Sequence, residues 1–329
     1  MKAAGFGPTV VAVGGGHGLA TTLRATRTYA GDVTAVVSVA DDGGSTGRLR
    51  AATPRPAPGD LRKCLVALAS TDGPIVTAME HRFSNGELDG HAFGNLLIVA
   101  LEESEGDLVA ALDEAGRLLG CVGRVLPTTT QSVDLRARVD SGGVVRGQVA
   151  VAARTDLREV TVTPDDVVAC EPAVAAIGAA DQVVLGPGSL YTSVLAATAV
   201  PGIGDAVRGT GAQVVYVCNL HPQVSETAGY RVEDHVAALA RHGLEPDVVL
   251  YDPSTIGCAG DVAGALAVAV AGQGGRAHDP VLLGAALAAL APARSAPAGS
   301  APGSAPGSVP VLGRKSPPEQ DQRSSVREP

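Results

Sequence analysis

Apolar residues follow two patterns along this chain. Longer stretches with helical spacing, such as Leu19 to Tyr29, separate short apolar runs that are rich in valine. Buried strands that alternate with helices are typical of βαβ units and a parallel sheet. The pattern therefore predicts a Rossmann-like α/β fold, a parallel sheet with helices on both faces. The predicted strands are Thr9 to Val13, Val33 to Val39, Gln182 to Leu185, Gln213 to Val217 and Asp247 to Tyr251.

One stretch, at about 123–163, departs from this rhythm. Val133, Leu135, Ala137 and Val139 alternate with polar residues, and the turn 140–143 follows them. A period of two, ended by a glycine turn, predicts an antiparallel hairpin or small meander inserted in the α/β core. This small β insertion either covers the site or forms a contact in a homo-oligomer, and the sequence leaves both open.

The composition changes at about residue 292. Alanine, proline, glycine and serine repeat up to Pro310, and a charged segment runs from there to Pro329. Such a segment buries too little apolar surface to offset the entropy that ordering costs. We therefore expect one nucleotide-binding domain at 1–291 and a disordered tail at 292–329.

Composition and charge narrow the class of protein. Hydrophobic residues make up 45% of the 329 residues and aromatic residues only 2%, so the core consists mainly of Val, Leu, Ala and Ile. A formal net charge of −9 argues against a nucleic-acid partner. The five cysteines are scattered without a Cys-x-x-Cys pair, which fits a reducing compartment. With no signal-peptide pattern and no long apolar span, we expect a cytoplasmic protein without membrane insertion.

Glycine-rich loops follow two of the predicted strands. Glycines let a phosphate approach the backbone, and the helix that follows presents free N–H groups. Tight turns or capped helix starts would use the same residues. Because the carboxyl ends of parallel strands share one edge of the sheet, we expect both loops to bind one ligand. The candidate residues are Gly14, Gly15, Gly16, His17 and Gly18 in the first loop, and Gly186, Pro187, Gly188, Ser189, Tyr191 and Thr192 in the second.

An acidic loop follows the second predicted strand. Asp41 and Asp42 are adjacent carboxylates, which suit either a ribose or a Mg²⁺ ion. The hydroxyl groups and the arginine that follow add donors for an anion, although a solvated turn is the alternative. The candidate ligand-binding residues here are Asp41, Asp42, Gly43, Gly44, Ser45, Thr46, Gly47 and Arg48, with Asp41 and Asp42 as metal ligands only if Mg²⁺ is used.

Three further segments contribute candidates. Asp60 and Asn95 suit either a helix N-cap or a ligand contact. Arg62 and Lys63 could neutralise a phosphate, and His91 could donate to it or act as a base. Asn219 and Thr227 follow another predicted strand, and Asn219 is the better candidate for contact with a base or sugar.

These stretches together resemble the YvcK/CofD-like family, and most closely its YvcK branch of gluconeogenesis factors. The matching segments are VVAVGGGHGLATTLR, VADDGGSTGRLR, PGDLRKCLVALA, LDGHAFGNLLI, VLGPGSLYTSVL and VCNLHPQVSETAGY, in that order. The resemblance implies binding of UDP-sugars such as UDP-N-acetylglucosamine. It also implies a role in cell shape and envelope precursor supply on gluconeogenic carbon sources, with an unknown protein partner in envelope synthesis.

Three hypotheses follow. The first is a nucleotide-sugar-binding regulator without turnover, and the second is a Mg²⁺-dependent transferase of the CofD type, which moves phospholactate to a deazaflavin precursor. A nicotinamide-dependent dehydrogenase is the third, and Leu19 in place of the third glycine of its usual motif argues against it. No nucleophile–base pair stands out and the catalytic residues are unknown, so we favour the binder over the enzyme.

Overall fold

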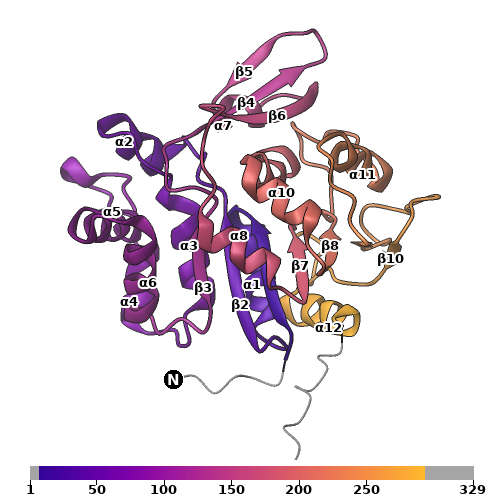
Figure 1. Ribbon diagram of the computed structural model, residues 1–329, viewed down its shortest axis with the longest axis horizontal. Helices are drawn as coiled ribbons and strands as arrows, with labels where there is room; N and C mark the ends of the chain where they lie inside the picture. The colour runs from indigo at the N-terminus through magenta and orange to yellow at the C-terminus, as the bar shows by residue number, and fades with distance from the viewer. Residues whose placement is uncertain (1–6, 293–329) are drawn as a thin grey trace, which may run out of the picture. The chain divides into compact units, whose positions relative to one another are not determined.

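The computed structural model describes residues 7–292, whose main element is a parallel sheet of seven strands (Figure 1). The strand order is β10-β9-β8-β7-β1-β2-β3, and each neighbouring pair is parallel. The predicted Rossmann-like α/β fold is therefore confirmed. The strands are β1 (Thr9–Gly14), β2 (Asp32–Val37), β3 (Arg124–Pro127), β7 (Gln182–Leu185), β8 (Gln213–Val217), β9 (Val248–Tyr251) and β10 (Ala265–Ala267).

Helices cover both faces of this sheet. Right-handed crossovers place α1 and α3 on one face and α8, α10 and α11 on the other. α12 packs against α1, and α8 packs against α10. The helices are α1 (Gly16–Thr26), α2 (Gly44–Ala52), α3 (Pro58–Leu68), α4 (Pro74–Glu80), α5 (Phe93–Glu105), α6 (Leu108–Leu118), α8 (Glu171–Gly178), α9 (Ala196–Thr198), α10 (Pro201–Gly209), α11 (Val232–Arg241) and α12 (Pro280–Leu290), with short turns η1 (Gly86–Leu88) and η2 (Leu190–Leu195).

The core of the sheet consists of small branched side chains. In β1, Val10, Val11, Ala12 and Val13 have no exposed surface. A strand buried on both faces has a continuous apolar run in its sequence, and for this reason the sequence predicts β1. The first helix begins earlier than its apolar spacing predicts, at Gly16 rather than Leu19, because the glycine turn itself forms its first residues.

The predicted β insertion is a three-stranded antiparallel sheet in the order β5-β4-β6. It comprises β4 (Asp134–Val139), β5 (Val144–Arg146), α7 (Gln148–Ala152) and β6 (Leu157–Thr163). It lies beyond the carboxyl edge of the main sheet, at the top of Figure 1. The insertion begins later than the expected start near 123, because β3 pairs with β2 and joins the parallel sheet.

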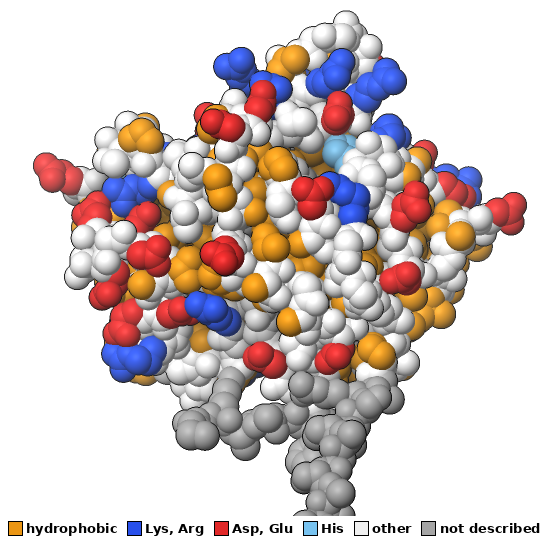
Figure 2. All heavy atoms as spheres, in the orientation of Figure 1, with side chains coloured by type: hydrophobic (Ala, Val, Ile, Leu, Met, Phe, Trp, Pro, Cys, Tyr) orange, Lys and Arg blue, Asp and Glu red, His pale blue; other side chains and the backbone are white. Residues whose placement is uncertain are grey.

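Basic side chains gather over the insertion in Figure 2, although the whole chain is acidic. Arg136 and Arg146 face each other across β4 and β5. Two ion pairs of this sheet are long, at 3.5 Å from Arg136 to Asp165 and 3.6 Å from Arg138 to Glu159. Residues 133–163 contain five arginines and four acidic residues, so the insertion is close to neutral while the whole chain is acidic.

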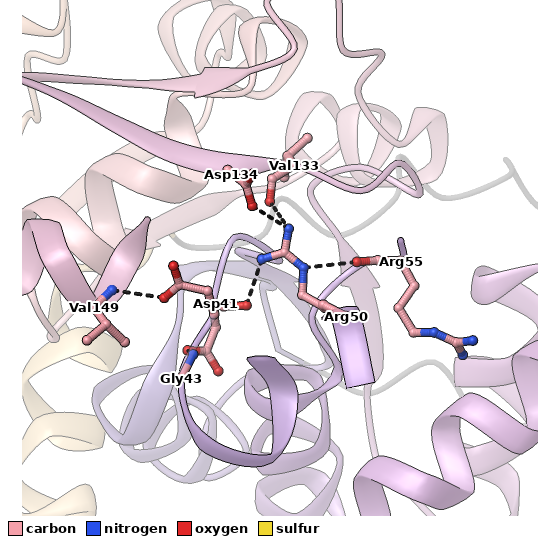
Figure 3. Close-up of polar contacts among 8 residues, drawn as sticks. Asp41, Gly43, Arg50, Arg55, Val133, Asp134 and Val149 are labelled. Atoms are coloured by element: carbon pink, nitrogen blue, oxygen red, sulfur yellow. Dashed lines mark hydrogen bonds and ion pairs between the residues drawn. The ribbon is translucent and has the colours of Figure 1, made fainter. Parts of the chain in front are cut away.

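Arg50 of α2 joins the insertion to the main domain (Figure 3). Its guanidinium donates to the backbone carbonyls of Asp41 at 2.9 Å, Val133 at 2.6 Å and Arg55 at 3.2 Å. It also forms an ion pair of 2.7 Å with Asp134, the first residue of β4. Only 9% of the Arg50 side chain is exposed, so these carbonyls have few alternative donors.

Asp42 makes a second contact with the insertion. Its carboxylate accepts a hydrogen bond from the N–H of Val149 in α7 at 2.9 Å. Arg50 thus holds the start of β4, and Asp42 holds α7, close to the loop that follows β2.

Two remaining expectations concern the tail and the membrane. The tail at 292–329 lies outside the described residues except for its first residue. Within residues 7–292, no single helix is long and apolar enough to span a membrane, although the bent pair Leu190–Thr198 and Pro201–Gly209 together has the required length and composition.

We predict that Arg50→Ala lowers the free energy of unfolding by about 2–3 kcal/mol, because several buried acceptors lose a charged donor. Urea denaturation measures the change. Arg117→Ala is the matched control, since Arg117 forms only an exposed ion pair with Glu114. Equal stability of the two variants would show that Arg50 does not hold the insertion.

Candidate functional site

Two glycine loops meet where the strand order reverses. β1 pairs with β2 on one side and with β7 on the other, so the crossovers leave β1 and β7 in opposite directions. The hydroxyl of Thr22 in α1 donates to the carbonyl of Gly186 at 2.6 Å. A side chain at Gly18 would clash with the carbonyl of Pro187, so only glycine allows this close approach. The two loops that the sequence predicts to converge are therefore in contact.

A cavity of about 470 Å³ opens between these loops. The insertion contributes to it through α7, so the insertion covers part of the site. The lining residues are Gly15, Gly16, His17, Gly18, Thr21, Asp41, Asp60, Lys63, Gln148, Pro187, Gly188, Ser189, Ser193, Asn219, Leu220, His221, Gln223, Arg276, Ala277 and His278.

Asp60 occupies the N-terminus of α1. One carboxylate oxygen accepts the N–H of Gly16 at 2.7 Å, and the other forms an ion pair of 2.9 Å with Lys63. The N-cap of its own helix, α3, is Ala57, and Pro58 begins the helix. Asp60 therefore does not cap α3 as the sequence suggested. It stabilises the positive end of a neighbouring helix instead, since that end favours a negative charge.

Asp41 points into the same cavity. Burial raises the pKa of its carboxyl, and the charge of Asp60 raises it further. Hydrogen bonds from the backbone N–H of Gly43, at 3.0 Å, and from Thr46 act in the opposite direction. The carboxylates of Asp41 and Asp60 thus lie close enough to influence each other, with Lys63 as their nearest cation.

His17 lies on the charged side of the cavity, in the first turn of α1. Burial lowers the pKa of its imidazole, and the nearby Lys63 lowers it further. His17 is therefore neutral at pH 7 and can donate or accept a hydrogen bond. A helix leaves its first N–H groups without intrahelical acceptors, so this turn also offers backbone donors to an anion.

The carboxylates on this side suffice for a Mg²⁺ ion only when a bound ligand adds further oxygen atoms. Within residues 7–292, no three His, Cys, Asp or Glu side chains cluster closely enough to hold a metal. Mg²⁺ commonly binds one or two carboxylates together with phosphate oxygens and water. Asp41 and Asp60 meet that requirement. Asp42, the other predicted metal ligand, is turned away toward α7.

The β8 side of the cavity carries one cation, Arg276, among neutral hydrogen-bonding groups. Asn219 accepts the N–H of Gly188 at 3.1 Å, and Gln223 donates to the hydroxyl of Ser189 at 2.7 Å. His221 and His278 complete this side. The cavity therefore has a half near β1 and β2 that holds both of its carboxylates, and a half near β8 that is rich in neutral hydrogen-bonding groups and also holds Arg276.

Several predicted residues form a partly buried network beside the cavity. Ser45 lies 3.1 Å from the ring of His91 and accepts the amide of Asn95 at 3.2 Å. Asn95 in turn accepts from Arg62 at 3.1 Å, and Arg48 donates to the carbonyl of Asp89. Asn95 lies inside the first turn of α5, whose N-cap is Ala92. These side chains connect the loops that carry the site.

Other predicted residues support the second loop from behind. The carboxylate of Glu226 accepts the N–H groups of Tyr191 at 3.0 Å and Thr192 at 3.1 Å. Thr227 accepts the N–H of Gln223 at 2.8 Å. The predicted ligand-binding residues outside the cavity lining are Gly14, Asp42, Gly43, Gly44, Ser45, Thr46, Gly47, Arg48, Arg62, His91, Asn95, Gly186, Tyr191, Thr192 and Thr227.

The sequence interpretation missed part of the lining. Thr21 and Ser193 lie just past the glycine motifs, and Gln148 lies in the insertion. The sequence does contain a signal beside the last segment, 276–278. Asp279 and Pro280, which follow it, are typical of a helix start, and the Asp279 carboxylate caps α12. The missed residues are Thr21, Gln148, Ser193, Leu220, His221, Gln223, Arg276, Ala277 and His278.

Comparisons with known proteins agree with this architecture. The sequence model of the family described as 2-phospho-L-lactate transferase CofD matches residues 10–258. A protein of Mycobacterium tuberculosis is 48% identical over 257 residues, which cover 74% of each chain. A Halalkalibacterium halodurans protein named Gluconeogenesis factor is 40% identical over 247 residues, covering 74% of this chain and 77% of its own. The crystal structure of a UPF0052 family member from Bacillus halodurans aligns with a TM-score of 0.80 at 33% identity, over 85% of this chain and 98% of that one.

We predict that Asp41→Asn raises the melting temperature of the ligand-free protein by about 2 °C or more, a change that roughly 1 kcal/mol produces. The pKa of Asp41 is higher in the folded chain than in the unfolded chain. The charged form of Asp41 therefore destabilises the fold at pH values above that raised pKa. The gain is therefore largest at neutral pH and disappears as the pH falls toward the ordinary value of 3.8.

Asp42→Asn is the control for this experiment, because the Asp42 carboxylate accepts the Val149 N–H and its neutralisation weakens that bond. Thermal scans between pH 4 and pH 8 compare the two variants. A pH-independent gain, or a gain of the same size in both, would contradict the assigned role of Asp41.

Proposed function

The chain belongs to the family of 2-phospho-L-lactate transferase CofD, and we propose that it is a gluconeogenesis factor that binds a nucleotide-sugar without turning it over. UDP-N-acetylglucosamine is the proposed ligand. The proposed role is regulation of cell shape and envelope precursor supply on gluconeogenic carbon sources, through a protein partner in envelope synthesis. The protein would act in the cytoplasm.

The division of the cavity into two halves carries this proposal. A nucleotide-sugar has a diphosphate that needs cations and N–H donors, and a base and sugars that need neutral hydrogen-bonding groups. Lys63 and the first turn of α1 suit the diphosphate, and Asn219 and Gln223 suit the neutral parts. A volume of about 470 Å³ also falls in the range of about 300–1,000 Å³ that is usual for small-molecule sites.

The hydroxyl groups of the cavity favour binding over covalent catalysis. Ser189 and Ser193 line the cavity, but in the described part of the chain neither hydrogen bonds to a histidine side chain. A serine nucleophile is most commonly activated by such a histidine base. The cavity therefore supplies groups that recognise a ligand rather than a nucleophile that attacks it.

The second candidate function is a Mg²⁺-dependent transfer of the CofD type. The juxtaposition of Asp41 and Asp60 favours it, because these two carboxylates offset the charges of the lining cations Lys63 and Arg276 and leave a diphosphate unneutralised. Mg²⁺ held there would polarise the phosphoryl oxygens and neutralise charge that develops during transfer. Asp41 and Asp60 would hold the ion and orient the diphosphate.

We predict that UDP-N-acetylglucosamine raises the melting temperature of the protein. A ligand at 100 times its dissociation constant adds about 2.7 kcal/mol when it binds only the folded state. Lys63→Ala should weaken binding by about tenfold or more, because it removes a charged donor to the phosphate. Isothermal titration calorimetry measures both proteins.

Arg124→Ala is the control, since Arg124 forms an exposed ion pair with Asp113 and does not line the cavity. An unchanged melting temperature across a panel of UDP-sugars at millimolar concentration would rule out the proposed function.

We also predict that the wild-type protein, incubated with UDP-N-acetylglucosamine and Mg²⁺, releases no free nucleotide. Chromatography of the nucleotides detects release. Asp60→Asn should raise affinity, because it removes a carboxylate that competes with a phosphate for the N-terminus of α1 and for Lys63. Mg²⁺-dependent release that disappears in Asp60→Asn, while nucleotide affinity is largely kept, would instead establish the transferase.

A further inference from the structure

A second cavity, of about 1010 Å³, lies between α1, α3 and α4, and we call it the α1/α4 groove. It shares no lining residue with the ligand cavity. Its buried lining residues, Ala67, Ala69 and Val76, are all apolar. The groove is therefore a separate feature of the surface with an apolar base.

Phe83 and Phe93 also line the groove, and they are two of the three phenylalanines in the chain. The N–H of Phe83 donates to the carbonyl of His91 at 3.0 Å, and the N–H of Phe93 donates to the carbonyl of His81 at 2.9 Å. The ring of His81 meets that of Phe83 edge to face, with 5.1 Å between the ring centroids. Aromatic side chains are enriched at protein interfaces, and a fixed backbone lowers the entropy lost on association.

The two sides of the groove carry opposite charges. Arg24 lies in the last turn of α1 and Arg27 directly follows that helix, whereas Asp72 precedes α4 and Glu80 ends it. Within residues 7–292, none of these four side chains forms an ion pair. All four charges are thus available to an occupant of the groove.

The groove differs from the ligand cavity in its polar atoms. In the described part of the chain, no residue that lines the groove has a buried side-chain polar atom without a partner. Sites for polar small molecules place a few polar groups inside an enclosed pocket. Here the base is apolar and the charges lie on exposed residues at the edge, an arrangement typical of an interface between proteins.

We propose that this groove is the interface of a twofold-symmetric dimer, in which its occupant is the same face of a second copy of this chain. A twofold axis places a surface against its own copy, so a face with one basic and one acidic side is complementary to itself. The α1 side of each copy then meets the α4 side of the other, and every attractive contact forms twice. Ile75, which is 42% exposed at the start of α4, supplies an apolar side chain for the partner's groove.

Sedimentation equilibrium of the full chain tests the proposal. We expect a monomer–dimer equilibrium whose dissociation constant rises with salt, because exposed charge pairs are screened. Arg24→Glu and Glu80→Arg should each raise the dissociation constant at least about tenfold, because each brings like charges together twice. An equimolar mixture of the two variants should dimerise at least about tenfold more tightly than either variant alone, because unlike charges then meet again.

Glu105→Arg and Arg158→Glu are the matched controls. They change the net charge by the same amounts, and both residues are exposed and lie outside the groove. Arg24 and Glu80 are exposed as well, so their variants are expected to fold. If one does not fold, the sedimentation of the wild-type protein and its salt dependence still decide.

A wild-type chain that remains monomeric up to millimolar concentration would overturn the proposal and leave the groove to a different protein. A dimer that neither reversal weakens more than its control uses another face, which also overturns it. So would a mixture that dimerises no more tightly than the single variants, or a dissociation constant that does not rise with salt. The proposal does not depend on nucleotide-sugar binding, which calorimetry measures separately.

Discussion

The reversal of strand order between β1 and β7 is the constraint on which the other features depend. Right-handed crossovers leave these two strands in opposite directions, so the loops at their carboxyl ends separate and a cavity remains between them. The close approach of Gly18 to Pro187 holds the two loops together at the base of that cavity. The different chemistry of the two halves of the site follows from which strands lie on either side.

The charges in the half of the cavity near β1 and β2 partly neutralise one another. Asp60 takes the position at the α1 N-terminus that an anion would otherwise occupy, and Lys63 pairs with it. A phosphate that enters must share these groups, and Asp41 adds a second carboxylate whose burial is unfavourable. The arrangement suits a binding function but lowers the stability of the fold, which is common at functional sites with perturbed pKa values.

The sequence predicted the sheet and the loops but only part of the site. Continuous valine runs such as that of β1 require burial on both faces, and glycine motifs fix where loops start. The ends of strands could therefore be read locally. The role of Asp60 could not, because its partner Gly16 is 44 residues away and belongs to another helix. Gln148 and His278 reach the cavity only through tertiary contacts, and no local pattern marks them as site residues.

Hydrogen–deuterium exchange with and without UDP-N-acetylglucosamine tests the central claim most directly. The account predicts slower exchange in residues 15–18, 186–189 and 219–223 together, because one ligand contacts the loops after β1, β7 and β8. Unchanged exchange in these loops would contradict it. So would protection confined to the larger cavity of about 1010 Å³ that α1, α3 and α4 line, with Arg24 and Phe83 among its residues.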